Sequence, residues 1–99
     1  MQDISLPKAA KVLIIGGGVV GCSVAYHLAK LGWKDILLLE RKQLTSGTTW
    51  HAAGLIAQLR ATQNMTRLAK YSQELYTSLE SETGVATGFR QNGSITAAL

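Results

Sequence analysis

The sequence contains only one cysteine, one proline and one phenylalanine among its 99 residues. Because Cys22 is the only thiol, the chain has neither a disulfide framework nor a cysteine-pair zinc motif. No apolar run approaches the roughly 18 residues of a membrane span, and the segment MQDISLPK at the start lacks the apolar centre of a signal peptide. These absences favour a cytoplasmic protein, with the mitochondrial matrix as the alternative if the chain is processed.

Acidic residues are also few, with 6 Asp and Glu against 10 Lys and Arg, which gives a formal net charge of +4. A nucleic-acid interface would gather this excess on one face or stripe. The basic residues are instead scattered, and Arg41-Lys42 is the only adjacent pair. We therefore predict no nucleic-acid partner. His27 has no second histidine, cysteine or acid at a metal-ligand spacing, which predicts no metal site there.

The most informative stretch is an apolar run that leads directly into three spaced glycines. Residues 11–15 read as a buried parallel strand, and Gly16-x-Gly18-x-x-Gly21 follows at once. In a dinucleotide-binding fingerprint the first glycine makes a tight turn, the second lets the backbone approach a pyrophosphate, and the third lets the helix pack against the strand. The helix N-terminus then offers free N–H groups to the phosphates.

The residues after the fingerprint complete a strand–helix–strand unit. Apolar residues at helical spacing predict a helix over 19–31, with Val20, Val24, Leu28 and Leu31 on its packed face and Gly32 as its stop. Residues 36–40 then form a second apolar strand that ends in a carboxylate. The pattern predicts a parallel βαβ unit with a right-handed crossover.

The carboxylate that ends this strand is Glu40. An acid about 20 residues past the glycines is placed to accept hydrogen bonds from ribose hydroxyls, and it disfavours a 2′-phosphate, so NADP is not expected. Arg41 could stack near the adenine, pair with phosphate or remain a solvated charge. FAD and NAD share the adenosine half, so Glu40 does not distinguish them.

A loop, a long helix and a turn signal follow. Residues 45–49 are rich in hydroxyl groups and predict a loop with donors for an anion. An amphipathic helix is expected over 65–82, with Thr62 or Asn64 as its N-cap and Gly84 as its stop. Further on, Asn92-Gly93 between residues 89–91 and 94–97 predicts a β-hairpin with a type I′ turn, the beginning of an antiparallel sheet.

A chain of this size can bury roughly 60–65% of its unfolded surface. That burial supports a core, but it is too little for a complete dinucleotide-binding sheet together with a substrate domain. The last residues also read as part of a strand. We therefore expect the chain to be the N-terminal part of a longer protein, unable to act by itself.

The segment SGTTWHAAG, residues 46–54, carries a family resemblance. Together with the fingerprint and the glutamate before it, this segment resembles the N-terminal region of the dimethylglycine/sarcosine dehydrogenase family of D-amino-acid-oxidase-like FAD enzymes. The resemblance covers nearly all of residues 10–99. The fingerprint alone would suit many FAD and NAD proteins, whereas the segment after it is much narrower and favours FAD.

The resemblance implies an α/β fold and a site. It implies a Rossmann-like βαβ FAD/NAD(P)-binding unit and flavin loop over 11–60, a helix over 61–84 and the start of the substrate-domain sheet over 85–99. His51 matches the family's covalent attachment point, where an imidazole bonds the 8α-methyl carbon of the flavin. The residues expected to bind the cofactor are Gly16, Gly18, Gly21, Glu40, Arg41, Ser46, Thr48, Thr49 and His51.

The resemblance also implies an activity, the oxidative demethylation of dimethylglycine or sarcosine. Electrons would leave through an electron-transferring flavoprotein, and a tetrahydrofolate site would lie in a C-terminal region beyond these residues. Three alternatives remain open: an oxidase that passes electrons to oxygen, a catalytically silent regulatory flavoprotein of the same family, and an NAD-binding module. Catalytic residues cannot be placed in this stretch.

Overall fold

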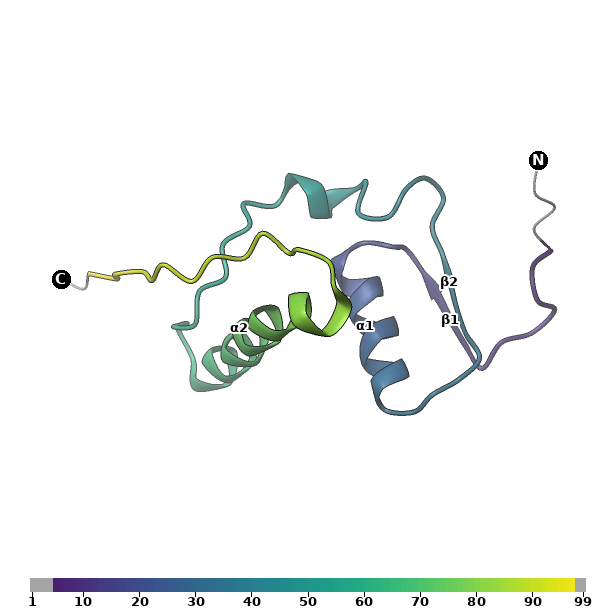
Figure 1. Ribbon diagram of the computed structural model, residues 1–99, viewed down its shortest axis with the longest axis horizontal. Helices are drawn as coiled ribbons and strands as arrows, with labels where there is room; N and C mark the ends of the chain where they lie inside the picture. Colours follow the sequence, from purple (N-terminus) through teal and green to yellow (C-terminus); the bar gives the residue numbers. More distant parts are fainter. Residues whose placement is uncertain (1–4, 98–99) are drawn as a thin grey trace. The chain divides into compact units, whose positions relative to one another are not determined.

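The computed structural model of the protein describes residues 5–97. The chain divides into two compact units, Met1–Ala53 and Gly54–Leu99. The first unit contains β1 (Val12–Ile15), α1 (Val19–Lys30), β2 (Ile36–Leu39) and the short 3₁₀ helix η1 (Thr48–His51), and the second contains α2 (Gln63–Thr83) (Figure 1).

The first unit is built on a parallel pair of strands joined by a helix. β1 pairs with β2 in the register Val12↔Ile36 to Ile15↔Leu39, and α1 lies beside both strands (Figure 1). Beyond the last pair, the Gly16 N–H donates to the Leu39 carbonyl at 2.8 Å. The predicted βαβ unit is confirmed, with β1 starting one residue later and β2 ending one residue earlier than expected.

The turn after α1 also follows the sequence. Leu31 is the C-cap residue, and Gly32 comes next with φ +92°, a conformation that side chains rarely adopt. The Gly32 N–H donates to the Ala29 carbonyl at 3.0 Å. A glycine just past the last helical turn is the expected stop, and here the prediction is confirmed.

The packing of the first unit is looser than the sequence pattern predicts. Within residues 5–97 no hydrophobic side chain is fully buried, and Gly17 is the one buried residue. Val20 and Leu31, expected on the packed face of α1, are 74% and 77% exposed. Two strands are too narrow to cover the whole apolar stripe of a helix that crosses them.

The same limit applies to the sheet. The sequence predicts that β1 is buried on both faces, but burial alternates along it, and Leu13 and Ile15 are 53% and 82% exposed. Successive side chains of a strand point to opposite faces. α1 therefore covers one face of β1, and the other face is open in the part of the chain that the structure describes.

In the second unit, both ends of the helix match the expected capping residues. The Thr62 hydroxyl accepts the Met65 N–H at 3.2 Å, so Thr62 rather than Asn64 is the N-cap of α2. Gly84 ends the helix in the left-handed conformation, with φ +75°. Of the packing face that the sequence predicts, Met65 and Leu68 are 52% and 61% exposed. The rest of that face is half-buried: Ala69, Ser72, Leu75, Tyr76 and Leu79.

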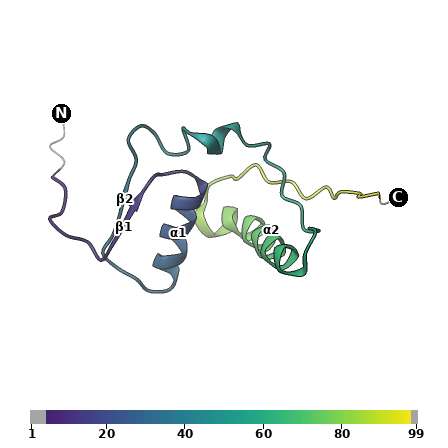
Figure 2. The ribbon, with the colours of Figure 1, turned by 180° about the vertical axis from the view of Figure 1, so that it is seen from behind.

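The predicted hairpin over 89–97 is wrong for the described residues. Residues 85–97 contain no strand, and they run on from α2 as an irregular segment (Figure 2). Gly93 has φ +80°, but Asn92 is not among the positive-φ residues, whereas a type I′ turn needs both. A two-stranded hairpin is marginal without a third strand or a helix to cover it, and Phe89 lies instead near Tyr76, with 6.2 Å between ring centroids. Residues 98–99, the end of the predicted strand, lie outside the described part.

Candidate functional site

The glycine turn between β1 and α1 is the centre of the candidate site. Gly16 has φ +111°, which favours glycine at the first position of the fingerprint. A Cβ atom at Gly21 would lie only 2.0 Å from the Gly16 carbonyl oxygen. The third glycine therefore allows α1 to pass directly against the turn, and any side chain there would require the backbone to move.

Glu40 is joined directly to this turn. Its Oε1 accepts the Gly17 N–H at 3.0 Å, and its Oε2 accepts the Lys42 N–H at 2.8 Å. These hydrogen bonds, that from Lys42 first, lower the pKa of the Glu40 carboxyl, and the nearby charge of Arg41 adds to the effect. Glu40 is therefore a carboxylate at neutral pH, and each oxygen retains lone-pair capacity for a further donor.

Thr49 comes from the distant end of the unit to the start of α1. Its Oγ1 accepts the Val19 N–H at 2.9 Å, although 30 residues separate the two in sequence. The same loop is held a second time, because the Thr45 N–H donates to the Gly17 carbonyl at 2.8 Å. The sequence predicted hydroxyl donors in this loop, but it gave no signal that one of them would accept the first amide of α1.

His51 ends η1 with its side chain exposed. Its Nδ1 lies 2.9 Å from the Gly47 carbonyl oxygen, and the ring stands 4.0 Å from that of Trp50 between centroids. A carbonyl oxygen can only accept, so this hydrogen bond requires the proton on Nδ1. Nε2 then carries the lone pair of the neutral imidazole.

The remaining predicted residues take no part in the hydrogen bonds described above. Ser46 is half-buried, while Thr48 and Arg41 are exposed. The structure thus brings Glu40 and Thr49 to the glycine turn, and it places Ser46, Thr48 and His51 along the loop that Thr49 attaches to α1.

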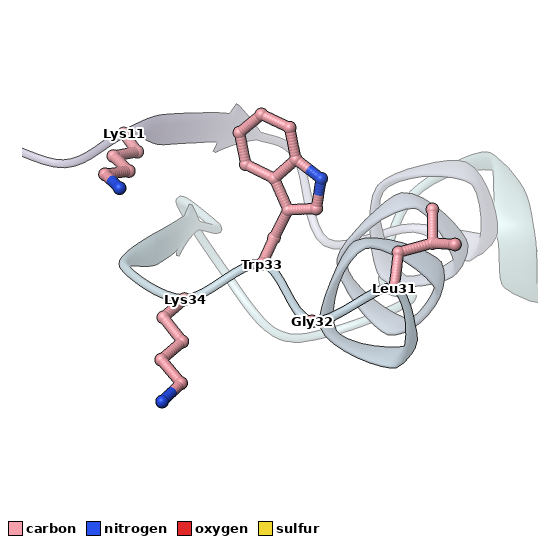
Figure 3. A pocket seen from close by; sticks show the side chains of 5 residues that line it. All are labelled: Lys11, Leu31, Gly32, Trp33 and Lys34. Atoms are coloured by element: carbon pink, nitrogen blue, oxygen red, sulfur yellow. The ribbon is translucent and has the colours of Figure 1, made fainter.

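A shallow pocket of about 390 Å³ lies at the other end of the same unit. Figure 3 shows Trp33 above the loop after α1, with Lys11 at the start of β1 and Lys34 directed away from the ring. Lys11 precedes β1, whereas the glycine turn follows it. This pocket is therefore separate from the candidate site.

The local chemistry suits a dinucleotide. A turn without side chains approaches the start of α1, the first turn of that helix has no acidic residue, and a carboxylate lies at the end of the neighbouring strand. Such a helix start attracts phosphate groups, and such a carboxylate attracts ribose hydroxyls. Among residues 5–97 no group of three metal-binding side chains occurs, and no described helix is long and apolar enough to cross a membrane. The fold and the site together define a dinucleotide-binding βαβ unit.

The family of this unit follows from comparison with known proteins. Residues 11–99 match the family described as FAD dependent oxidoreductase. The chain belongs to this family, which agrees with the resemblance found in the sequence and assigns FAD as the cofactor of the class.

Individual relatives agree with the family. The chain is 48% identical over 97 residues to the mitochondrial pyruvate dehydrogenase phosphatase regulatory subunit of Mus musculus. This match covers 98% of the chain and 11% of the relative. It is 54% identical over 86 residues to the mitochondrial dimethylglycine dehydrogenase of Homo sapiens, covering 87% of the chain and 10% of the relative. It is 50% identical over 91 residues to the human mitochondrial sarcosine dehydrogenase, covering 91% and 10%.

A solved structure shows the same fold. Glycine oxidase from Bacillus cereus ATCC 14579 matches with a TM-score of 0.67 and 36% identity, over 84% of this chain and 24% of that chain. The chain thus spans about a tenth of the length of the curated relatives named above.

Proposed function

We propose that this chain is the FAD-binding start of an oxidoreductase that removes a methyl group from an N-methyl amino acid, dimethylglycine or sarcosine. The observation that carries the cofactor part is the Glu40 carboxylate on the Gly17 amide, at the turn where α1 begins. The substrate part rests on the identities of 54% and 50% to relatives named for those two substrates.

Each part of the site has a separate task in this proposal. The turn from Gly16 to Gly21 admits the pyrophosphate, and the N–H groups at the start of α1 other than that of Val19 stabilise its charge. Glu40 accepts hydrogen bonds from the ribose, while Arg41, Ser46 and Thr48 lie along the rest of the nucleotide. The hydroxyl of Thr49, also expected from the sequence to bind the cofactor, is instead bonded to the Val19 N–H. FAD, when bound, supplies the redox chemistry by accepting a hydride equivalent from the substrate.

His51 is the proposed attachment point for the flavin. Because Nδ1 is directed to the Gly47 carbonyl, Nε2 is the nitrogen with a free lone pair. Nε2 would form the bond to the 8α-methyl carbon as one C–H bond of that methyl breaks. The proton of that C–H bond would pass to solvent, and FAD, when bound, would take up the electron pair.

The complete protein would need further partners. We propose an electron-transferring flavoprotein as the acceptor of electrons and a tetrahydrofolate site elsewhere in the full-length protein, as the resemblance implies. The three relatives named above are mitochondrial proteins. Their location supports the matrix alternative over the cytoplasmic prediction.

A second candidate function is regulatory. The similarity to the pyruvate dehydrogenase phosphatase regulatory subunit, 48% over 97 residues, is comparable to the similarity to the dehydrogenases. A silent flavoprotein would use the same turn and the same glutamate but would not turn over an amine. The similarity to glycine oxidase favours a third candidate, an enzyme that passes electrons to oxygen.

One experiment separates these candidates. The full-length protein and its His51→Ala variant are precipitated in acid, washed and examined for flavin absorbance and fluorescence, and both are then assayed with dimethylglycine and sarcosine. We expect a yellow wild-type pellet, a colourless variant pellet and substrate-dependent reduction of an electron acceptor without peroxide. Peroxide formation would favour the oxidase, flavin without turnover the regulatory protein, and no flavin in either fraction would refute the FAD assignment.

A further inference from the structure

We propose that Thr49 is a positioning residue, whose hydroxyl attaches η1 to the first amide of α1 and so sets the place of His51 along the cofactor. The inference rests on the proposed function, because it takes His51 as the flavin attachment point. It adds a residue that acts through His51 and does not itself react.

The contact between Thr49 and α1 is close and needs a glycine beside it. The Val19 N–H donates to Thr49 Oγ1 at 2.9 Å, and Thr49 is half-buried, in contrast to the exposed Thr48. A Cβ atom at Gly18 would lie 2.9 Å from the same oxygen. Real Cβ atoms essentially never approach that closely, so the second glycine of the fingerprint provides the space that Thr49 occupies.

A second hydrogen bond fixes the other end of the same loop. The Thr45 N–H donates to the Gly17 carbonyl at 2.8 Å. The loop is therefore attached to the fingerprint twice, at Thr45 by its backbone and at Thr49 by its side chain. Loss of the hydroxyl would free the downstream end, which carries His51, and leave the upstream end in place.

The His51 ring is oriented from within this attached segment. Its Nδ1 hydrogen bond goes to the carbonyl of Gly47, which lies between the two attachment points. The direction of Nε2 thus depends on the position of the loop relative to the start of α1. Formation of a covalent bond requires the two atoms to be held in near-attack geometry, and small misplacements slow it.

This arrangement predicts that loss of the Thr49 hydroxyl slows covalent attachment of the flavin more than it weakens the affinity for FAD. We expect the affinity for FAD to depend on Glu40, whose contacts are the Gly17 and Lys42 amides, and on the N–H groups of the glycine turn other than that of Val19, which is already bonded to Thr49. Removal of the hydroxyl should therefore slow covalent incorporation by about three- to tenfold, the range expected for loss of one hydrogen bond. The dissociation constant of FAD before the bond forms should change by less than about twofold.

The test uses the full-length protein produced in flavin-depleted cells and then mixed with FAD. Samples are quenched in acid over time, and protein-bound flavin is followed by fluorescence in the denatured band. Thr49→Val removes the hydroxyl at nearly constant shape, Thr49→Ser keeps it, and Thr77→Val is the control because its exposed hydroxyl bonds only within α2. FAD affinity is measured by fluorescence titration in the His51→Ala background, where no bond can form.

A second variant removes the other partner of the hydrogen bond. Val19→Pro deletes the donor N–H at the first position of α1, where proline is well tolerated. Gly18 has φ −83° and ψ −170°, an extended conformation that a following proline accepts. If the hydrogen bond is the cause, Thr49→Val should have no additional effect on the incorporation rate in Val19→Pro protein.

The possible results distinguish the positioning role of Thr49 from the proposed flavin attachment at His51. The positioning role is supported by three results together. Thr49→Val incorporates flavin slowly, Thr49→Ser incorporates it at the wild-type rate, and adding Thr49→Val to Val19→Pro protein does not slow incorporation further. The positioning role alone is overturned if Thr49→Val incorporates flavin at the wild-type rate. It is also overturned if Thr49→Val and Val19→Pro slow incorporation by factors that multiply in the double variant. A wild-type protein that never retains flavin in acid refutes the His51 linkage and the inference together, and an equal loss of FAD affinity and rate identifies Thr49 as a binding residue instead.

Discussion

Replacement of Gly21 by alanine tests the geometry of the glycine turn most directly. The new Cβ would stand 2.0 Å from the Gly16 carbonyl oxygen and 3.4 Å from the Ile14 side chain. The first distance is far below any contact that a Cβ can make, and the atom it meets belongs to the backbone. Either α1 must move away from β1, or the turn at Gly16 must change its conformation.

The direction of the change in stability shows whether this clash or helix propensity dominates in Gly21→Ala. Gly21 lies within α1, where alanine in place of glycine would by itself stabilise the helix by about 1 kcal/mol. Overpacking of this kind costs about 1–3 kcal/mol and occasionally more. Since the obstructing atom is backbone, we expect the upper end of that range, a net loss of about 2 kcal/mol after the gain in propensity, together with weaker binding of FAD.

The assay compares full-length wild-type, Gly21→Ala and Ser23→Ala proteins by urea unfolding and by fluorescence titration with FAD. Ser23→Ala is the matched control because it places alanine on the exposed side of the same helix. Its stability should stay within about 0.5 kcal/mol of wild type. A Gly21→Ala protein that is as stable as the control, or more stable, would show that α1 does not pass against the Gly16 carbonyl and would refute the reasoning.

Three further predictions concern the hydrogen bonds of Glu40 and Thr62. Glu40→Gln should weaken FAD binding by about tenfold in fluorescence titrations at neutral pH, the loss expected of a charged hydrogen-bond acceptor, and unchanged affinity would contradict the ribose role. The lowered pKa of Glu40 stabilises the fold above the ordinary pKa of glutamate, and this contribution is lost as pH falls through the lowered value. The difference in melting temperature between wild type and Glu40→Gln should therefore shrink in acid, and a constant difference would argue against the hydrogen bonds from Gly17 and Lys42. In the second unit, Thr62→Ala should destabilise α2 by about 1 kcal/mol, measured by urea unfolding and circular dichroism, because it removes the N-cap. Asn64→Ala is its control, and an equal loss in both variants would exclude Thr62 as the cap.

Most of the secondary structure could be predicted because it depends on neighbours in sequence. The helix ends at Gly32 and Gly84 require a left-handed residue just past the last turn, and glycine meets that need wherever the rest of the chain lies. The Thr62 cap depends on an amide three residues away. The pairing of β1 with β2 followed from two apolar runs on either side of one helix.

The hairpin and the buried faces could not be predicted in the same way. Asn92-Gly93 is a favourable turn sequence, but a turn forms a stable hairpin only where other strands or a helix cover it. The apolar pattern of β1 and α1 likewise states which side chains avoid water, and it does not state what covers them. Ile15 and Leu31 remain exposed because no further strand or helix covers their side chains in the described residues.

By itself, the sequence determined the class of this protein: a parallel βαβ unit with a dinucleotide fingerprint, an acid after β2 at the position expected to bind ribose, and a loop that resembles one family of FAD enzymes. Those features follow from spacing within one turn, one helix or one strand. Only the tertiary structure decided that Glu40 holds the Gly17 amide and that Thr49 holds the Val19 amide, across 23 and 30 residues of chain. Such hydrogen bonds depend on how the βαβ unit brings distant segments together, and no local pattern of residues encodes that distance.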